Sequence, residues 1–488
     1  MIMMIMWPAL RKIPRASMGA LLALGLAGCA AAPHLAEPTS RVAAPAQLDA
    51  VAAKGPLATP VDRWWMLWGD PALNRLVEKA LVANADIRAA QAHVKAARAL
   101  VSVAESALYP TIAANGSAWG SAGDADIDGT LGSLIAPYTQ DNAAGGYLVG
   151  LGARWEPDVF GGRHADVAVA KALSQSSARL ADGVRLIVVG DVVENYQQWQ
   201  GLRDRLAILD RSIKTAGRLV DYVVARQHTG AATVGDVSKA RAALQSLEAS
   251  RPPILSLIDA RRRRLAVLAG DLPEQLPEAG TNGALIIPLP PAGQLPSAIL
   301  DRRPDVGARA LIVEARAQRL NSLKTDLLPR FGISFLGQNG HLGLSGLPGF
   351  GGTVGLVGIN ASIPIFTGGL LRGRIEAGNA ELEAALAAYD RSVLAALEEV
   401  ETAYGFRGGL DERLTGLERT LALSKGRADQ AQHFYRAGRM TLGEVLQAEL
   451  DALSDEDKRE QARVAQGTAT VQLFRALGGG WTDHAGTN

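Results

Sequence analysis

One residue of this sequence stands in a setting that indicates covalent modification: the single cysteine, at position 29. Leu26-Ala27-Gly28 directly precede it, and small residues before a cysteine are what the enzymes that process bacterial lipoproteins accept. The predicted chemistry is attachment of diacylglycerol to the Cys29 sulfur, with Cys29 becoming the N-acylated first residue of the mature chain. Because Cys29 is the only cysteine, disulfides within the chain are excluded.

The residues before Cys29 have the composition of an export signal. A basic segment, residues 11–15, is followed by the uncharged apolar segment Met18 to Ala27. Together with the residues just before Cys29, this leader resembles a bacterial lipobox, so residues 1–28 are predicted to be a lipoprotein signal peptide. Residue 30 is Ala and not the Asp associated with inner-membrane retention, which favours the outer membrane. A plain cleaved signal with an incidental cysteine is the alternative.

Side chains that could form a catalytic or metal site are scattered. The sequence contains no Walker A loop, no His-Glu-x-x-His, no Gly-x-Ser-x-Gly and no Cys/His cluster, and its seven histidines stand apart. We therefore expect no enzyme activity, no catalytic residue, no metal and no cofactor. The formal net charge of +1 gives no indication of a nucleic-acid partner. No run of about 18 apolar residues occurs in the interior, so no transmembrane helix is predicted.

The elements that would position functional residues are organised as two copies of one unit. The first copy reads as a helical stretch from Leu73 to Ala107, two β segments separated by a Gly-rich loop, a long helix ending near Gly230, and a return helix. The second copy repeats this order, with a helix from Val306 to Thr325 and a long helix ending near Gly438.

Separations between equivalent landmarks show where the copies differ. Three landmarks recur: Pro110 and Pro329 lie 219 residues apart, Phe160 and Phe366 lie 206 apart, and Gly230 and Gly438 lie 208 apart. The loop between the strands therefore varies by 13 residues, while the helical arm is matched within two. Loops tolerate insertions, whereas an arm that spans a fixed gap does not. About 70 helical residues would reach roughly 100 Å, as a tunnel across the periplasm requires.

These patterns divide the chain into six parts. Proline-rich residues 271–297 are predicted to be a linker, because proline is excluded from helix interiors and central strands. The parts are residues 1–28, the signal peptide; 29–61, a lipid-anchored tether; 62–270, the first repeat; 271–297, the linker; 298–481, the second repeat; and 482–488, a tail.

The β segments, such as residues 357–363, alternate apolar and polar residues. This pattern is typical of membrane barrel strands and also of a soluble sheet with one wet face. Four strands are too few to close a useful barrel, and a sheet in lipid cannot leave its edges open. The barrel interpretation therefore requires several chains to pool their strands. Tyr109, Phe160, Phe331 and Phe366 fall at one set of strand ends, where either an interfacial girdle or a core cluster would place aromatic residues.

The long helices have an amphipathic, coiled-coil-like pattern. In residues 370–404, apolar side chains recur at spacings of three, four and seven among many alanines. An ordinary helical bundle has the same periodicity, so both interpretations stay open at this point.

Several short motifs occur together and in a fixed order. They are Trp64-Trp65-x2-Trp68-Gly69-Asp70-Pro71-x-Leu73-Asn74-Arg75-Leu76-Val77, Arg302-Arg303-Pro304-Asp305-Val306, Pro364-Ile365-Phe366-x2-Gly369, Glu398-Glu399-Val400-Glu401-Thr402-Ala403 and Ala476-Leu477-Gly478-Gly479-Gly480-Trp481. With the duplicated unit and the lipobox, they make nearly all of the mature chain resemble the TolC family of outer-membrane efflux proteins, in its OprM/NodT-like lipoprotein branch.

This resemblance implies a mixed α and β fold with internal duplication. Three chains would form an outer-membrane β-barrel of twelve strands, four from each chain, continued by a long periplasmic α-helical coiled-coil barrel. The implied function is the exit duct of a tripartite efflux pump for drugs or other toxic small molecules. The implied partners are a periplasmic adaptor (membrane fusion) protein, an inner-membrane pump of RND, major-facilitator or ABC type, and outer-membrane lipids. A type I secretion duct and a non-channel structural periplasmic lipoprotein are the alternatives.

The resemblance also implies a gate at the periplasmic hairpin turns, at Gly230 and Gly438. By motif position, Asp236 matches an acidic residue that bonds from the first hairpin to the second, Tyr435 matches its partner, and Glu444 matches one carboxylate of a ring that lines the bore. The sequence departs from the family pattern at Met440, where TolC has an arginine, and at Gln447, where a second ring acid is found. Arg436 or Arg439 would then supply the missing cation.

Overall fold

The computed structural model of the chain describes residues 42, 45, 47–49, 63–121, 144–275, 286–344 and 348–479. Cys29, the signal peptide and residues 480–488 lie outside these ranges, so the predicted lipidation is not addressed by the fold. Two compact units make up the described chain. Unit 1 includes Ala96–Ser174 and Leu311–Ala387, and unit 2 includes Ser40–Lys95, Gln175–Ala310 and Ala388–Asn488.

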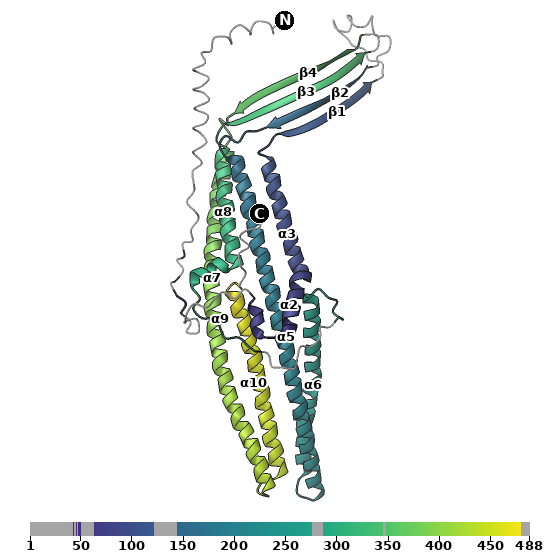
Figure 1. The fold of residues 1–488 in the computed structure, drawn as a ribbon, viewed down its shortest axis with the longest axis vertical. Coiled ribbons are helices and arrows are strands. Elements are labelled where there is room, and N and C mark those ends of the chain that lie inside the picture. The colour runs from purple at the N-terminus through teal and green to yellow at the C-terminus, as the bar shows by residue number, and fades with distance from the viewer. Residues whose placement is uncertain are drawn as a thin grey trace. The chain divides into compact units, whose positions relative to one another are not determined.

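Unit 1 contains a four-stranded antiparallel sheet (Figure 1). Its strands follow the order β1 (Thr111–Ser121), β2 (Ala144–Trp155), β3 (Arg330–Leu344) and β4 (Phe350–Ser362). The prediction of two strands from each copy is confirmed. The strands extend farther into the Gly-rich segments than side-chain alternation indicated. Glycine allows β2 and β3 to approach closely here, since a Cβ at Gly146 of β2 would lie 2.6 Å from the carbonyl oxygen of His341 on β3.

Tyr109, Phe160, Phe331 and Phe366 lie near one set of strand ends, as predicted. Thr111 pairs with Arg154, and Arg330 pairs with Ser362. The first residues of β1 and β3 therefore lie at the same end of the sheet as the last residues of β2 and β4. The rings of Phe160 and Phe331 are 6.5 Å apart. Tyr109 and Phe366 are 68% and 90% exposed in the single chain, which argues against a core cluster for these two residues.

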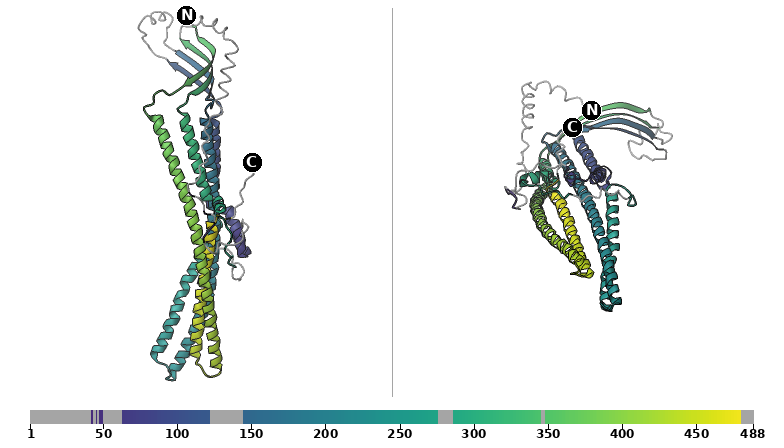
Figure 2. Two further views of the ribbon diagram at one scale, coloured as in Figure 1. Left: turned by 90° about the vertical axis from the view of Figure 1, so that its left-hand side faces the viewer. Right: turned by 60° about the horizontal axis from the view of Figure 1, so that its bottom comes forward.

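Four long helices, two from each copy, confirm the matched arms. The first copy supplies α5 (Gly162–His228) and α6 (Val234–Leu268), of 67 and 35 residues. The second copy supplies α9 (Leu370–Arg436) and α10 (Leu442–Ala476), again of 67 and 35 residues. Within unit 2 they form two hairpins, α5–α6 and α9–α10, that turn at the same end (Figure 2). None of the helices in the described ranges is long and apolar enough to cross a lipid bilayer.

The helical stretch predicted from Leu73 to Ala107 is two helices in the structure, α2 (Pro71–Ala83) and α3 (Ala85–Ser106). Asn84 separates them with an extended backbone conformation, at ψ 134°. Its side-chain oxygen accepts hydrogen bonds from the backbone amides of Asp86 and Ile87, and its amide donates to the carbonyl of Leu268. Asn84 is therefore the N-cap of α3, a preference that short polar side chains share.

The tryptophan motif builds the main core of unit 2. Trp64, Trp65 and Trp68 lie in the 3-10 helix η4 (Trp64–Trp68) and are buried against α5, α6 and α10. The Trp64 ring stacks on Phe474, with centroids 5.1 Å apart. Asp70 caps α2 by accepting from the Ala72 amide, and it also accepts a 2.7 Å hydrogen bond from the Tyr196 hydroxyl. This motif therefore has a packing and capping role.

The Arg302-Arg303-Pro304-Asp305 motif lies between α7 (Pro296–Arg302) and α8 (Pro304–Thr325). Helix α8 begins at Pro304, two residues before the predicted start at Val306, and has Asp305 in its first turn. The buried Arg303 donates to both carboxylate oxygens of Asp305 and to the Ala476 carbonyl, and pairs with Glu399 at 2.7 Å. One guanidinium thus connects the α8 start with α9 and the end of α10.

Residues 286–295, within the predicted proline-rich linker, have neither helix nor strand. They lie along α9, because the Tyr404 hydroxyl donates to the Pro291 carbonyl and Arg407 donates to the Pro288 carbonyl. Burial lowers the pKa of the Arg407 guanidinium to about 10. Gln294, at the end of this segment, accepts a 2.5 Å hydrogen bond from Arg302.

Candidate functional site

The two hairpin turns have the same local structure. At the end of α5, Gly230 has φ 77° and the Ala231 amide bonds back to the Arg226 carbonyl. At the end of α9, Gly438 has φ 70° and the Arg439 amide bonds to the Phe434 carbonyl. These are Schellman-type helix ends, which glycine favours because it adopts positive φ without a Cβ clash. Both glycines therefore terminate the long helices, as the sequence predicted.

Asp236 and Glu444 occupy equivalent positions after these turns. The Asp236 carboxylate accepts hydrogen bonds of 2.8 Å from the Thr233 amide and hydroxyl, while the Asp236 amide donates to the Thr233 hydroxyl. Glu444 has the same three bonds with Thr441. Each pair is a capping box that starts its return helix. Hydrogen bonds from the threonine backbone and hydroxyl lower the pKa of both exposed carboxyls, so both are charged at neutral pH.

The other predicted gate residues lie close by and are exposed. Tyr435 and Arg436 end α9, and Arg439 lies in the turn. No hydrogen bond joins Asp236 to Tyr435 within the part of the chain that the structure describes. Gln447, which stands at the position of the second ring acid, donates a 3.0 Å hydrogen bond to Asp451 on its own helix. Within a single chain, the carboxylates of Asp236 and Glu444 thus bond to a threonine of their own hairpin.

The two hairpins are joined by close packing of α5 on α10, which we call the α5–α10 seam (residues 190–222 and 443–475). Glycine permits this contact at several levels. A Cβ at Gly201 would overlap Val464, and one at Gly467 would overlap the Gln197 side chain. Near the turns, a Cβ at Gly443 would lie 2.7 Å from the Tyr222 ring. The two helix backbones are therefore as close as the neighbouring side chains allow.

Ion pairs extend the α5–α10 seam toward the turns. Arginines on α5 face acidic residues on α10 in three pairs: Arg205 with Asp457 at 2.7 Å, Arg211 with Glu456 at 2.8 Å, and Arg218 with Glu449 at 3.7 Å. Partly exposed pairs contribute only about 0–1 kcal/mol each, so they set the register of the helices more than their stability. Sequence reasoning missed the seam. The available signal was the seven-residue spacing of Arg211 and Arg218, which Glu449 and Glu456 share.

A buried carboxylate lies at the middle of α10. Glu460 is 3% exposed and lies 3.5 Å from both Arg459 and Arg463. Burial raises the pKa of Glu460, the nearby Arg463 opposes that shift, and the carboxylate of Asp204 on α5 adds to it. Glu460 is thus a buried carboxylate paired with two arginines of its own helix.

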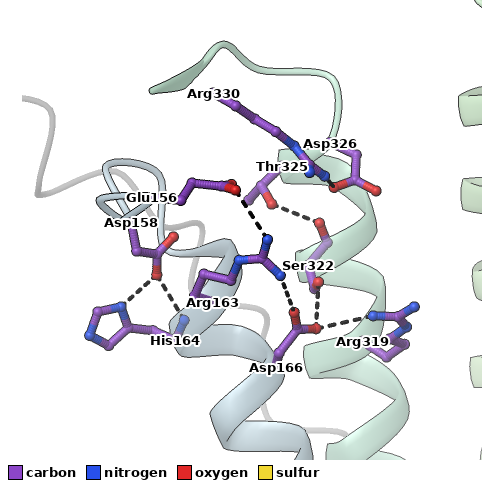
Figure 3. A network of polar contacts seen from close by, with 10 residues as sticks. All are labelled: Glu156, Asp158, Arg163, His164, Asp166, Arg319, Ser322, Thr325, Asp326 and Arg330. Carbon is purple, nitrogen blue, oxygen red and sulfur yellow. Dashed lines mark hydrogen bonds and ion pairs between the residues drawn. The ribbon is translucent and has the colours of Figure 1, made fainter. Parts of the chain in front are cut away.

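Unit 1 has a separate polar network at the ends of α5 and α8 (Figure 3). Arg163 pairs with Glu156 at 3.3 Å and with Asp166 at 3.9 Å. Asp166 in turn accepts hydrogen bonds from Arg319 and Ser322 of α8. The network lines a cavity of about 50 Å³. Its acidic and basic groups neutralise one another, so it ties the helix that follows β2 to the helix that precedes β3.

Comparisons with known proteins agree with this architecture. The family model described as "Outer membrane efflux protein" matches residues 76–271 and 295–479. The pyoverdine export outer membrane protein OpmQ of Pseudomonas aeruginosa is 30% identical over 471 residues, which cover 95% of this chain and 96% of that protein. OpmQ of Pseudomonas putida is 28% identical over 448 residues, covering 91% and 93% of the two chains.

Among solved structures, the outer-membrane channel OprN matches with a TM-score of 0.78 and 29% identity. The match covers 91% of this chain and 99% of OprN. The family match spans most of both repeats and includes both hairpins and the sheet, while η4 lies before its first residue. The chain therefore belongs to the outer membrane efflux protein family.

Proposed function

We propose that this chain is the outer-membrane exit duct of a tripartite efflux pump and passes small toxic molecules from the periplasm to the exterior. The observation that carries this proposal is the combination, in one chain, of a four-stranded antiparallel sheet with paired 67- and 35-residue helices. Relatives named for export of pyoverdine and of toluene support it. A periplasmic adaptor protein and an inner-membrane pump are the partners that such a duct requires.

The functional unit that we propose is a homotrimer in the outer membrane. In one chain, β1 and β4 are the outer strands of the sheet, and their outer backbone groups need partners wherever the sheet meets lipid. Three copies joined through β1 and β4 would make a closed twelve-stranded barrel. The same threefold arrangement would place the hairpins around one axis as a helical barrel.

Deletion of the gene that encodes this chain tests the function. Cells without the duct should accumulate more of the pump's substrates and should become susceptible to lower concentrations of toxic compounds. A plasmid copy should restore both properties. Unchanged accumulation and susceptibility across a panel of dyes, solvents and antibiotics would contradict efflux and leave the secretion or structural alternatives.

Cys29 is proposed as the lipid anchor. Replacement of Cys29 with serine should abolish incorporation of radiolabelled palmitate, because serine lacks the thiol that receives diacylglycerol. The wild-type chain should carry the label. Label that persists in Cys29→Ser would show that the lipid is attached elsewhere.

Glu444 is proposed to line the narrow end of the bore, with Asp236, Tyr435, Arg436 and Arg439 forming the remaining gate. Three Glu444 carboxylates on one ring would concentrate cations in the constriction. Glu444→Gln should therefore reduce cation selectivity and block by multivalent cations in single-channel recordings. Glutamine still completes a capping box, so the start of α10 should survive the change.

Glu418→Gln is the matched control for Glu444→Gln. It makes the same change at an exposed position of α9 that lies away from the turns and outside the proposed gate. Selectivity should stay near the wild-type value in this variant. If Glu444→Gln leaves selectivity and block unchanged, the ring assignment is wrong and Glu444 is a helix-capping residue alone.

A further inference from the structure

The polar network at the ends of α5 and α8 surrounds a cavity that the proposed export function does not use. Its volume is about 50 Å³. A space of about 10–15 Å³ admits one water molecule, so the cavity takes about three or four groups of that size. Glu156, Asp158 and Arg163 line it from the β2–α5 side, and Asp326 and Arg330 line it from the α8–β3 side. The cavity can therefore take the charged end of a small molecule, whereas an acyl chain must remain outside it.

Acidic and basic side chains lie side by side at this cavity (Figure 3). Arg163 lies 3.3 Å from Glu156 and 3.9 Å from Asp166, and the second distance is too long for a hydrogen bond. A guanidinium has five N–H donors, yet within the described residues the Arg163 side chain makes one hydrogen bond, to Glu156. The remaining donors suit a phosphate oxygen, and the carboxylates suit an ammonium group. A ligand with both charges adds no net charge to a network whose own charges are already paired.

An apolar surface adjoins the cavity. Phe160 lines the cavity, and its ring lies 6.5 Å from the ring of Phe331 on β3. Alternation along β3 places Ile333 and Phe335 on the same face of the sheet as Phe331. Trp155 at the end of β2 pairs with Ile333 and extends this face across the two strands. One side of the sheet therefore offers an uninterrupted apolar surface that begins at the cavity.

This apolar side faces lipid in the proposed barrel. The opposite face carries Arg154 and Ser334, which pair across β2 and β3, and the polar face of a membrane barrel lines its interior. Helix α5 runs from this end of the sheet to the turn at Gly230, so the cavity lies level with the periplasmic leaflet, which consists of phospholipids. The adjoining strands, β2 and β3, are the middle strands of the sheet. Neighbouring chains would join through β1 and β4 instead.

We propose that this cavity binds the headgroup of a phospholipid that carries a primary amine, namely phosphatidylethanolamine. Arg163 donates to the phosphate, and the Glu156 carboxylate accepts from the ammonium group. The acyl chains then lie along Phe160 and the apolar face that contains Phe331, at the level where membrane barrels carry aromatic side chains. The bound lipid holds the β2–α5 and α8–β3 connections at the depth of the headgroups. This inference rests on the proposed duct function, because that function places the sheet in the outer membrane.

Native mass spectrometry of the purified full-length assembly tests the site, with three lipids that have identical acyl chains. Phosphatidylethanolamine should bind about tenfold more tightly than phosphatidylcholine, whose quaternary ammonium cannot donate the hydrogen bond to a carboxylate. Phosphatidylglycerol, which lacks the amine, should bind as weakly as phosphatidylcholine. Soluble glycerophosphoethanolamine at the same concentration should not displace the lipid, because it has no acyl chains to bury on the apolar face.

Two variants and a matched control locate the binding. Arg163→Gln and Glu156→Gln should each weaken phosphatidylethanolamine binding by about tenfold, the effect of losing one hydrogen bond to a charged group. Arg185→Gln is the control, because Arg185 lies on the same helix, is 32% exposed against 35% for Arg163, and pairs with Asp182. The control should bind the lipid as the wild type does.

Four results would overturn the headgroup site: equal binding of the three lipids, a preference for either of the other two, displacement by the soluble headgroup, or wild-type binding by either cavity variant. Single-channel recording of the same samples reports on the duct separately. A protein that binds the lipid as expected but never conducts would count against the duct and leave the lipid site standing. A protein that conducts but shows no lipid preference would count against the lipid site alone.

Discussion

Replacing Trp64 with alanine is expected to lower the free energy of unfolding by about 3–5 kcal/mol, the usual range for removing a large buried aromatic side chain. Trp64 is fully buried, stacks on Phe474 of α10 and packs edge-on against Trp65 and Trp68. Its loss would leave a cavity where η4 meets α10. Thermal unfolding of the detergent-solubilised protein, followed by circular dichroism, measures the effect.

Leu67→Ala is the matched control, because Leu67 lies in the same 3-10 helix but is 43% exposed. It should shift the melting temperature only slightly. Similar shifts for the two variants would mean that the tryptophan motif does not carry the core of unit 2.

Replacing Gly201 with valine should wedge α5 away from α10. A Cβ at Gly201 would overlap Val464, and overpacking of a close helix contact typically costs about 1–3 kcal/mol. Because the α5–α10 seam joins the two hairpins, the variant should also loosen the ion pairs that lie nearer the turns. We expect a lower melting temperature and faster amide exchange in residues 443–457.

The second-site change Val464→Ala provides the check on Gly201→Val. Shortening Val464 should create room for the new side chain and restore most of the lost stability. Gly217→Val lies on the same helix, where an added Cβ meets nothing within 4 Å, and it should have little effect. If Val464→Ala fails to rescue while Gly217→Val is equally harmful, the loss is a general effect of adding a bulky side chain to α5 and does not come from the seam.

Much of the fold could be predicted from the sequence because the elements are long and repeated. The ends of α5 and α9 follow from Gly230 and Gly438, whose positive φ favours glycine. The break at Asn84 was missed because the apolar periodicity continues across it. Strand lengths were underestimated, since glycines such as Gly145 and Gly146 carry no apolar signal.

The site was less accessible to sequence reasoning. Asp236 and Glu444 were identified through family resemblance, yet the Thr-x-x-Asp and Thr-x-x-Glu spacing already indicates the capping boxes that the structure contains. Contacts between α5 and α10 join residues more than 200 positions apart, as in the pair Arg211 and Glu456, and local patterns do not specify such partners. Pro252 and Pro253 would predict that the helix ends before them, whereas α6 continues to Leu268.

The central claim is that copies of this chain form a continuous pore, and planar-bilayer recording of the purified protein tests it most directly. The sample should first be shown by detergent-corrected light scattering to contain three chains. We expect discrete conductance steps from these trimers and none from protein unfolded before reconstitution. A homogeneous, folded trimer that never conducts, or conductance that belongs to a monomer, would contradict the account.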